Sequence, residues 1–262
     1  MNKKADSSEN VVKLKQGSSA DAPARRKGIY LLPNLLTTGA LFAGFYAVLS
    51  GFTGQFELAA IAIFAAMIFD GLDGRVARMT NTQSDFGVQY DSLSDMVSFG
   101  VAPAVVAYGW GVSDLGKLGL AAAFVYASCA ALRLARFNVQ AESSDGKVFT
   151  GLPSPAAAAL VAGFVWSTYE LAPSVALSVL GAVLTAAAGL LMVSNFKYPS
   201  FKEVDLRGKV PFIVILSVVM GFVVITIDPP RILFMLAVFF SFSAPLIWLA
   251  KKLGFSASPK AD

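Results

Sequence analysis

The feature that most constrains the fold of this chain is a series of long apolar runs separated by short breaks. We interpret eight of them as membrane spans, at about 31–50, 56–73, 87–110, 118–136, 154–170, 174–194, 210–227 and 231–250. Several exceed the roughly 18 residues that are typical of a membrane-spanning helix. The runs are continuous and do not alternate between apolar and polar residues, which argues against a β-barrel. The sequence therefore predicts an all-α, polytopic integral membrane bundle of about eight transmembrane helices.

The composition agrees with this class and excludes several others. Charged residues make up only 15% of the chain, whereas soluble domains carry roughly 25%. The single cysteine, Cys129, lies in an apolar run, so a disulfide scaffold is excluded. The chain contains no histidine, which removes the commonest general base and any serine–histidine–aspartate triad.

The two ends of the chain differ from the apolar region between them. Residues 1–28 are polar and end in a basic cluster at 25–27, so we expect a disordered cytoplasmic tail that lies against anionic lipid headgroups. Nucleic-acid binding is the competing interpretation, but no aromatic residues are interleaved with the charges, and we expect no nucleic-acid partner. We place a transmembrane domain at 29–252 and a short cytoplasmic tail at 253–262.

Lysine and arginine are distributed unevenly around the predicted spans. Of the 21 basic residues, all but Lys117 and Arg231 fall in the tails, in the loops near 74–86, 137–153 and 195–209, or at the adjoining helix ends. Eight spans place all of these regions on one side of the membrane. Because basic residues are retained on the cytoplasmic side, we expect both termini and these loops to face the cytoplasm of a bacterial-type inner membrane.

Four aspartates mark the cytoplasmic ends of the second and third spans. Asp70 and Asp73 are three residues apart and Asp91 and Asp95 are four apart, so each pair lies on one face of its helix. A polar turn near 79–85 makes the two helices antiparallel neighbours. The sequence therefore predicts that the acidic faces converge into one four-carboxylate cluster.

Such a cluster is costly unless something compensates its charge. An ionised aspartate deep in a spanning helix costs about 2.5–3.5 kcal/mol, and four neighbouring anions repel one another. Divalent cations relieve both penalties, and oxygen ligands favour Mg²⁺, Mn²⁺ or Ca²⁺. The structural alternative is that the aspartates cap helices or pair with Arg75 and Arg78.

Small residues lie beside these acids. Gly74 and Ala77 leave the surface of the second span bare, and Gly87 does the same one turn before Asp91. This pattern is typical of close backbone approach to a nucleotide or phosphate, although small residues also serve helix–helix contact in membranes. Arg78 lies one turn from Gly74 and could offer a planar fork to a diphosphate.

The spacing of these residues resembles a known family signature. The pattern Asp-x2-Asp-Gly-x2-Ala-Arg-x8-Gly-x3-Asp-x3-Asp, which the chain matches without departure from Asp70 to Asp95, is similar to that of the CDP-alcohol phosphatidyltransferases. Segments at 32–47, 91–104, 131–138 and 149–158 further resemble the membrane-embedded phosphatidylserine synthase branch. Such enzymes join CDP-diacylglycerol to L-serine and give phosphatidylserine and CMP.

This resemblance implies specific roles. Asp70, Asp73 and Asp91 would bind two divalent cations, Mg²⁺ or Mn²⁺, while Asp95 would bind a cation and act as the base. The CDP-diacylglycerol site would comprise Asn34, Thr37, Gly74, Ala77, Arg78, Ser84 and Gly87. The resemblance also implies a homodimer and a six-helix catalytic core. A direct attack on phosphorus needs no covalent intermediate, in keeping with the absence of histidine.

Arg133, Arg136 and Asn138 lie at the cytoplasmic end of the fourth predicted span and are candidate partners of the acceptor carboxylate. Anchoring by the positive-inside rule explains the two arginines equally well. Ser154 is interpreted as the N-cap of the fifth span rather than a substrate contact.

Two alternative functions stay open at this stage. The first is a related transferase that uses another acceptor, either glycerol 3-phosphate or an inositol compound. The second is a cation-coupled transporter whose acidic cluster forms an ion site, but the acids lie near one end of their spans and no inverted repeat is found.

Overall fold

The computed structural model of the protein describes residues 31–141, 149–171, 174–198 and 212–253, and these are almost entirely helical. The elements are α1 (Leu31–Phe52), α2 (Phe56–Thr80), α3 (Asp85–Asp95), the π-helix η2 (Met96–Val101), α4 (Ala102–Trp110), the 3-10 helix η3 (Val112–Leu115), α5 (Lys117–Ala141), β1 (Phe149–Thr150), α6 (Ser154–Thr168), α7 (Val175–Val193), β2 (Lys197–Tyr198), α8 (Phe212–Ile227) and α9 (Pro229–Lys252). The predicted all-α class is confirmed. The predicted tails at 1–28 and 253–262 lie outside the described residues, apart from Leu253.

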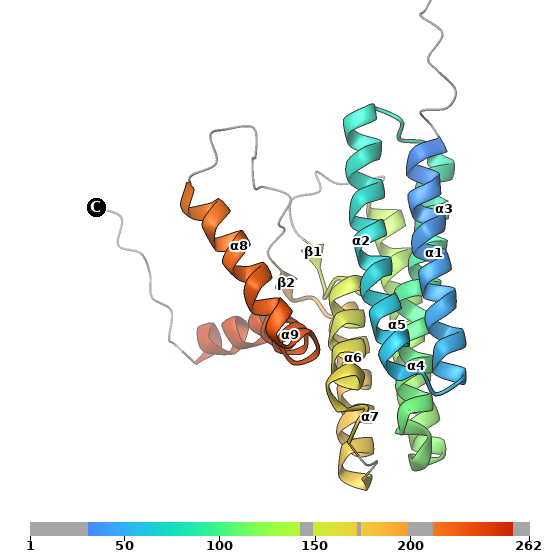
Figure 1. The fold of residues 1–262 in the computed structure, drawn as a ribbon, viewed down its shortest axis with the longest axis vertical. Helices are drawn as coiled ribbons and strands as arrows, with labels where there is room; N and C mark the ends of the chain where they lie inside the picture. The colour runs from blue at the N-terminus through green and yellow to red at the C-terminus, as the bar shows by residue number, and fades with distance from the viewer. Residues whose placement is uncertain (1–30, 142–148, 172–173, 199–211, 254–262) are drawn as a thin grey trace, which may run out of the picture.

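Six rods form the main bundle in Figure 1: α1, α2, the consecutive α3–η2–α4, α5, α6 and α7. The rod α1 packs against both α2 and α3, so it joins the two helices that carry the aspartates. The helix α9 lies beside the bundle at a steep angle to it and packs against α6, and α8 contacts α9 (Figure 1). All of the candidate site residues except Ser84, which directly precedes α3, lie on these six rods.

Four helices are long and apolar enough to cross a membrane, at Leu31–Phe52, Lys117–Val139, Val175–Val193 and Pro229–Ala250. The other predicted spans differ from these for physical reasons. The helix α2 carries several charges in its second half, and α6 has only 15 residues, or about 22 Å, against a hydrocarbon core of about 30 Å. The structure thus supports a membrane protein, and the count of eight spans stays a prediction.

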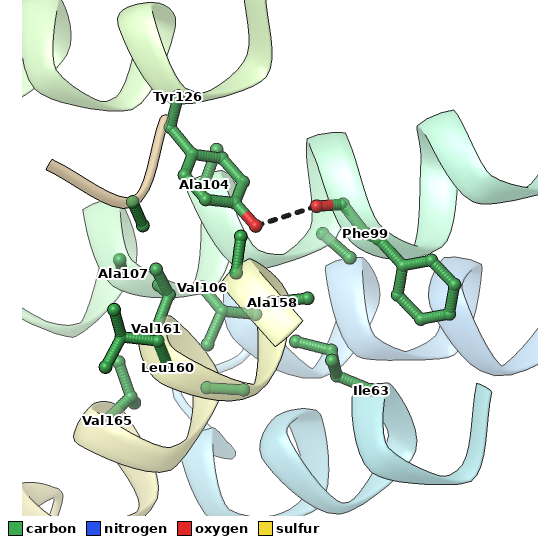
Figure 2. Packing of buried hydrophobic residues seen from close by; sticks show 14 of the residues in the cluster. Ile63, Phe99, Ala104, Val106, Ala107, Tyr126, Ala158, Leu160, Val161 and Val165 are labelled. Atoms are coloured by element: carbon green, nitrogen blue, oxygen red, sulfur yellow. Dashed lines mark hydrogen bonds between the residues drawn. The ribbon is translucent and has the colours of Figure 1, made fainter. Parts of the chain in front are cut away.

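The core of the bundle is built from small residues and a few large ones. Figure 2 shows buried side chains of this core, among them Ile63 of α2, Val106 of α4 and Leu160 of α6. Helices approach most closely where a glycine faces a neighbour: a Cβ on Gly44 of α1 would collide with Ser98 of η2. Close packing of this kind holds α1 against the rod that carries Asp91 and Asp95.

The predicted single span at 87–110 is interrupted by the π-helix η2, which starts directly after Asp95. The sequence gives a reason for the interruption. In an uninterrupted α-helix the Phe99 carbonyl would accept from the backbone nitrogen of residue 103, but Pro103 has no N–H. The hydroxyl of Tyr126 on α5 donates to this carbonyl instead, at 2.8 Å (Figure 2). A neighbouring helix thus satisfies the backbone group that proline frees, as expected in a membrane bundle.

Candidate active site

Three of the four predicted acids meet at one point. Asp70 from α2 and Asp91 and Asp95 from α3 each offer a carboxylate oxygen, and these oxygens lie within 4.8 Å of one another. Because Asp91 and Asp95 are one turn apart, both face the same point on α2. The convergence predicted from the spacing is therefore observed for these three residues.

Asp73 lies beside this group, with its carboxylate turned toward α1. Its side chain is only 5% exposed, and its Oδ2 accepts a hydrogen bond from the Thr37 hydroxyl of α1 at 2.6 Å. Such a short hydrogen bond is typical of a charged acceptor. The charge of Asp73 still acts on Asp70 and Asp91. The structure thus brings three of the four predicted carboxylates to one point, while the hydrogen bond with Thr37 turns the fourth, Asp73, toward α1.

The structural alternative for the acids does not agree with the structure. The N-cap of α3 is Ser84 and the C-cap of α2 is Asn81, so none of the four aspartates caps these helix ends. In the part of the chain that the structure describes, the one ion pair joins Arg231 to Asp228. Arg75 and Arg78 are exposed. The carboxylates are therefore gathered without a basic side chain bound to them.

A buried oxygen in this group has no partner. Asp91 Oδ1 makes no hydrogen bond among the described residues, although solvent does not reach it. Leaving such an atom unsatisfied is costly, and the cost is largest for a charged group. The orphaned atom, together with the all-oxygen donor set, fits a hard divalent cation such as Mg²⁺ or Mn²⁺.

One arginine lies at the edge of the acidic group. The charge of Arg133, on α5, acts on Asp70 and Asp95, and its Nη1 donates to the Ser154 hydroxyl at 2.7 Å. Sequence reasoning missed this contact, and its N-cap interpretation of Ser154 is wrong. Pro153 is the N-cap of α6, and Ser154 is the first residue inside the helix.

The other two candidate acceptor residues have partners elsewhere. Arg136 Nη1 donates to the carbonyl of Val193 at 3.3 Å, where α7 ends and its last carbonyls lack helical partners. The Asn138 side chain bonds Ser92 at 3.0 Å and Gln89 at 3.4 Å, both on α3. The structure therefore brings Arg133 to the acids, places Arg136 at a helix end, and uses Asn138 to join α5 to α3.

The residues predicted for the nucleotide, apart from Thr37, form two groups. Asn34 and Ser84 gather at Gly87, where an added Cβ would lie 3.6 Å from Asn34 Oδ1 and 3.2 Å from Ser84 Oγ. The Ser84 hydroxyl also accepts from the Gly87 backbone at 3.0 Å and so caps α3. Thr37 is buried and bound to Asp73.

Gly74 and Arg78 form the second group, with Ala77 half-buried between them on α2. A Cβ on Gly74 would meet only the Arg78 guanidinium, at 3.5 Å. Among the described residues, no other helix comes within 4 Å of this Cβ position, so the structure gives no helix contact that would explain the glycine. The bare surface and the exposed arginine together leave room for an anionic ligand.

Comparison with known proteins decides the family. The family model for CDP-alcohol phosphatidyltransferases matches residues 30–194, which span α1 to α7 and all of the site residues above. The chain belongs to the CDP-alcohol phosphatidyltransferase family. It is a transferase of phospholipid biosynthesis, and this membership favours the enzyme over a cation-coupled transporter. Members of the family use divalent metal ions, in agreement with the acidic group.

Individual relatives of this phosphatidyltransferase are similar over most of their length. The CDP-diacylglycerol–serine O-phosphatidyltransferase of Helicobacter pylori strain J99 is 40% identical over 198 residues, which cover 74% of this chain and 83% of the relative. The enzyme of the same name from Bacillus subtilis is 35% identical over 172 residues, or 66% of this chain and 92% of the relative. Among solved structures, phosphatidylinositol phosphate synthase of Mycobacterium tuberculosis matches with 19% identity and a TM-score of 0.43, covering 63% of this chain and 84% of that one.

Proposed function

We propose that this phosphatidyltransferase transfers the phosphatidyl group of CDP-diacylglycerol to the hydroxyl of L-serine, giving phosphatidylserine and CMP. The observation that carries the proposal is that Arg133, whose Nη1 donates to the Ser154 hydroxyl at 2.7 Å, lies near enough to Asp70 and Asp95 for its charge to act on both. A guanidinium next to the acidic group can bind the carboxylate of an amino-acid acceptor. The names of the Helicobacter pylori and Bacillus subtilis relatives support the same substrates.

Asp70, Asp73, Asp91 and Asp95 would hold two divalent cations, with Asp73 oriented by the Thr37 hydroxyl. When bound, the cations neutralise the charge of the diphosphate and of the leaving CMP. Asp91, whose buried Oδ1 has no hydrogen-bond partner among the described residues, would be one of the cation ligands.

Asp95 is the proposed general base. The serine hydroxyl is a weak nucleophile at neutral pH, so a carboxylate must take its proton as the new bond forms. The hydroxyl oxygen then attacks the phosphorus that bears the diacylglycerol, and the bond to CMP breaks. Because Arg133 acts on Asp95, a serine whose carboxylate lies at Arg133 would present its hydroxyl near this base.

The proposed CDP-diacylglycerol site lies on α1, α2 and the start of α3. It comprises Asn34, Thr37, Gly74, Ala77, Arg78, Ser84 and Gly87. Gly74 would let the ligand approach the backbone of α2, and the planar guanidinium of Arg78 would bind the diphosphate. Arg136 and Asn138 would complete the acceptor side by holding the end of α5 in place.

The membrane setting is part of the proposal. The uneven distribution of basic residues supports an inner-membrane protein whose termini and active site face the cytoplasm, where serine and CMP exchange. The lipid substrate would enter laterally. We further propose a homodimer with eight spans per chain.

An acceptor panel tests the proposal. Purified protein receives labelled CDP-diacylglycerol, Mg²⁺ or Mn²⁺, and either L-serine, glycerol 3-phosphate or inositol. We expect CMP release to depend on L-serine. Release that depends on another acceptor would assign the chain to a different branch of its family.

A further inference from the structure

Ser154 makes an unusual contact for a buried serine at the start of a helix. Its side chain is 0% exposed, and it accepts a hydrogen bond at 2.7 Å from a guanidinium that lies beside the acidic group. It does not cap α6, since Pro153 occupies that position. The hydroxyl therefore has one evident partner among the described residues, the side chain of Arg133.

Without this hydrogen bond, the Arg133 guanidinium could move toward other partners. Asp70 and Asp95 both attract its charge, yet neither forms an ion pair with it in the described part of the chain. An arginine side chain has many rotamers, and an unanchored guanidinium beside two carboxylates would move onto them. Such a movement would occupy the proposed base and take the guanidinium away from the acceptor.

The segment that leads into Ser154 is itself held in place by backbone hydrogen bonds. The backbone nitrogens of Gly151 and Leu152 donate to the carbonyls of Phe196 at 2.8 Å and Leu191 at 2.9 Å. Gly151 has a φ of +85°, and a Cβ there would collide with the carbonyl of Met192, so only glycine fits. The chain therefore enters α6 from a fixed point at the end of α7, and this fixes Ser154.

We propose that Ser154 is a positioning residue for acceptor recognition, which holds the Arg133 guanidinium beside the acidic group and free to bind the carboxylate of L-serine. The inference rests on the proposed function, because it assumes that the acceptor is an amino acid. It assigns Ser154 no contact with the substrate.

The test compares two buried serines in the full-length protein. Ser154→Ala removes the acceptor for Arg133, while Ser241→Ala removes a hydroxyl that is equally buried and has no hydrogen-bond partner among the described residues. We expect Ser154→Ala to raise the KM for L-serine about tenfold, since a hydrogen bond to a charged group is lost. The KM for CDP-diacylglycerol should change by less than about twofold, and Ser241→Ala should change neither value. An unchanged KM for L-serine, or an equal rise for both substrates, would overturn the proposal.

A second variant guards against a folding defect. Ser154→Cys keeps nearly the same side-chain size but replaces the hydroxyl with a weak acceptor, so its KM for L-serine should rise in the same direction. An unchanged KM in this variant also contradicts the proposal. Failure of the proposed function looks different, because the unaltered protein would then release no CMP in response to L-serine.

Discussion

The hydroxyl of Tyr126 on α5 donates a hydrogen bond to the carbonyl of Phe99, at the point where η2 interrupts the rod formed by α3 and α4. Tyr126 is 0% exposed, and the carbonyl has lost its usual helical donor to Pro103. The contact therefore satisfies a buried backbone group in the segment that directly follows Asp95. It also fastens that segment to the helix that carries Arg133.

Tyr126→Phe should destabilise the protein by about 1–3 kcal/mol, because it removes a buried hydroxyl that donates to the Phe99 carbonyl. Chemical denaturation of the detergent-solubilised protein measures the loss. Tyr46→Phe, which alters an exposed tyrosine on α1, is the control and should change stability by less than about 0.5 kcal/mol. Equal effects of the two substitutions would show that the hydroxyl of Tyr126 contributes nothing to the rod.

The sequence could predict that Pro103 frees a backbone group and that a neighbouring helix satisfies it. It could not predict which residue does so, because Tyr126 lies on a helix that approaches only in the folded bundle. The π-helix was missed for the same reason. Apolar periodicity predicts a continuous span at 87–110 and contains no signal for one extra residue per turn.

In the site, too, features within one helix were predictable from the sequence, whereas contacts between helices were not. The spacing of Asp91 and Asp95 is a property of one helix, so their shared face was predictable. Arg133 and Arg136 lie one turn apart on α5 and are equivalent in sequence, yet Arg133 donates to Ser154 at the start of α6 and Arg136 donates to Val193 at the end of α7. Their difference depends on where α6 and α7 pack. The partnership of Thr37 with Asp73 likewise depends on the packing of α1 against α2.

Asp91→Asn should preserve or raise the stability of the metal-free protein and weaken the stabilisation that added metal provides. In EDTA the variant should be at least as stable as the unaltered protein, since it removes a buried charge whose Oδ1 has no partner. In a titration with MgCl₂ or MnCl₂, it should need at least about tenfold more metal for the same rise in melting temperature.

Asp85→Asn is the matched control for this experiment, because Asp85 is exposed at the start of the same helix. Its metal titration should follow that of the unaltered protein. A metal response of Asp91→Asn equal to that of the control would remove Asp91 from the proposed cation ligands.

Asp95→Asn should lower turnover by about 10²- to 10⁴-fold, because an amide cannot take the proton of the acceptor hydroxyl. Binding of CDP-diacylglycerol should be largely retained, since the predicted lipid-binding residues lie on α1, α2 and the start of α3. Single-turnover CMP release and equilibrium binding of the CDP-lipid separate the two effects. Asp114→Asn, at an exposed position in η3, should keep full turnover. If Asp95→Asn turns over normally, another group is the base.

Two glycines on α2 offer the sharpest test of the nucleotide site. A Cβ on Gly71 would meet nothing within 4 Å, and one on Gly74 would meet only Arg78, so alanine fits at both positions. Each substitution should stabilise the helix by up to about 1 kcal/mol, because alanine is the better helix former. Only Gly74→Ala should also raise the KM for CDP-diacylglycerol, since its methyl group fills the bare surface beside Arg78. A paired measurement of melting temperature and KM distinguishes a ligand site from simple helix propensity: if Gly74→Ala matches Gly71→Ala in both, the bare surface does not contact the nucleotide.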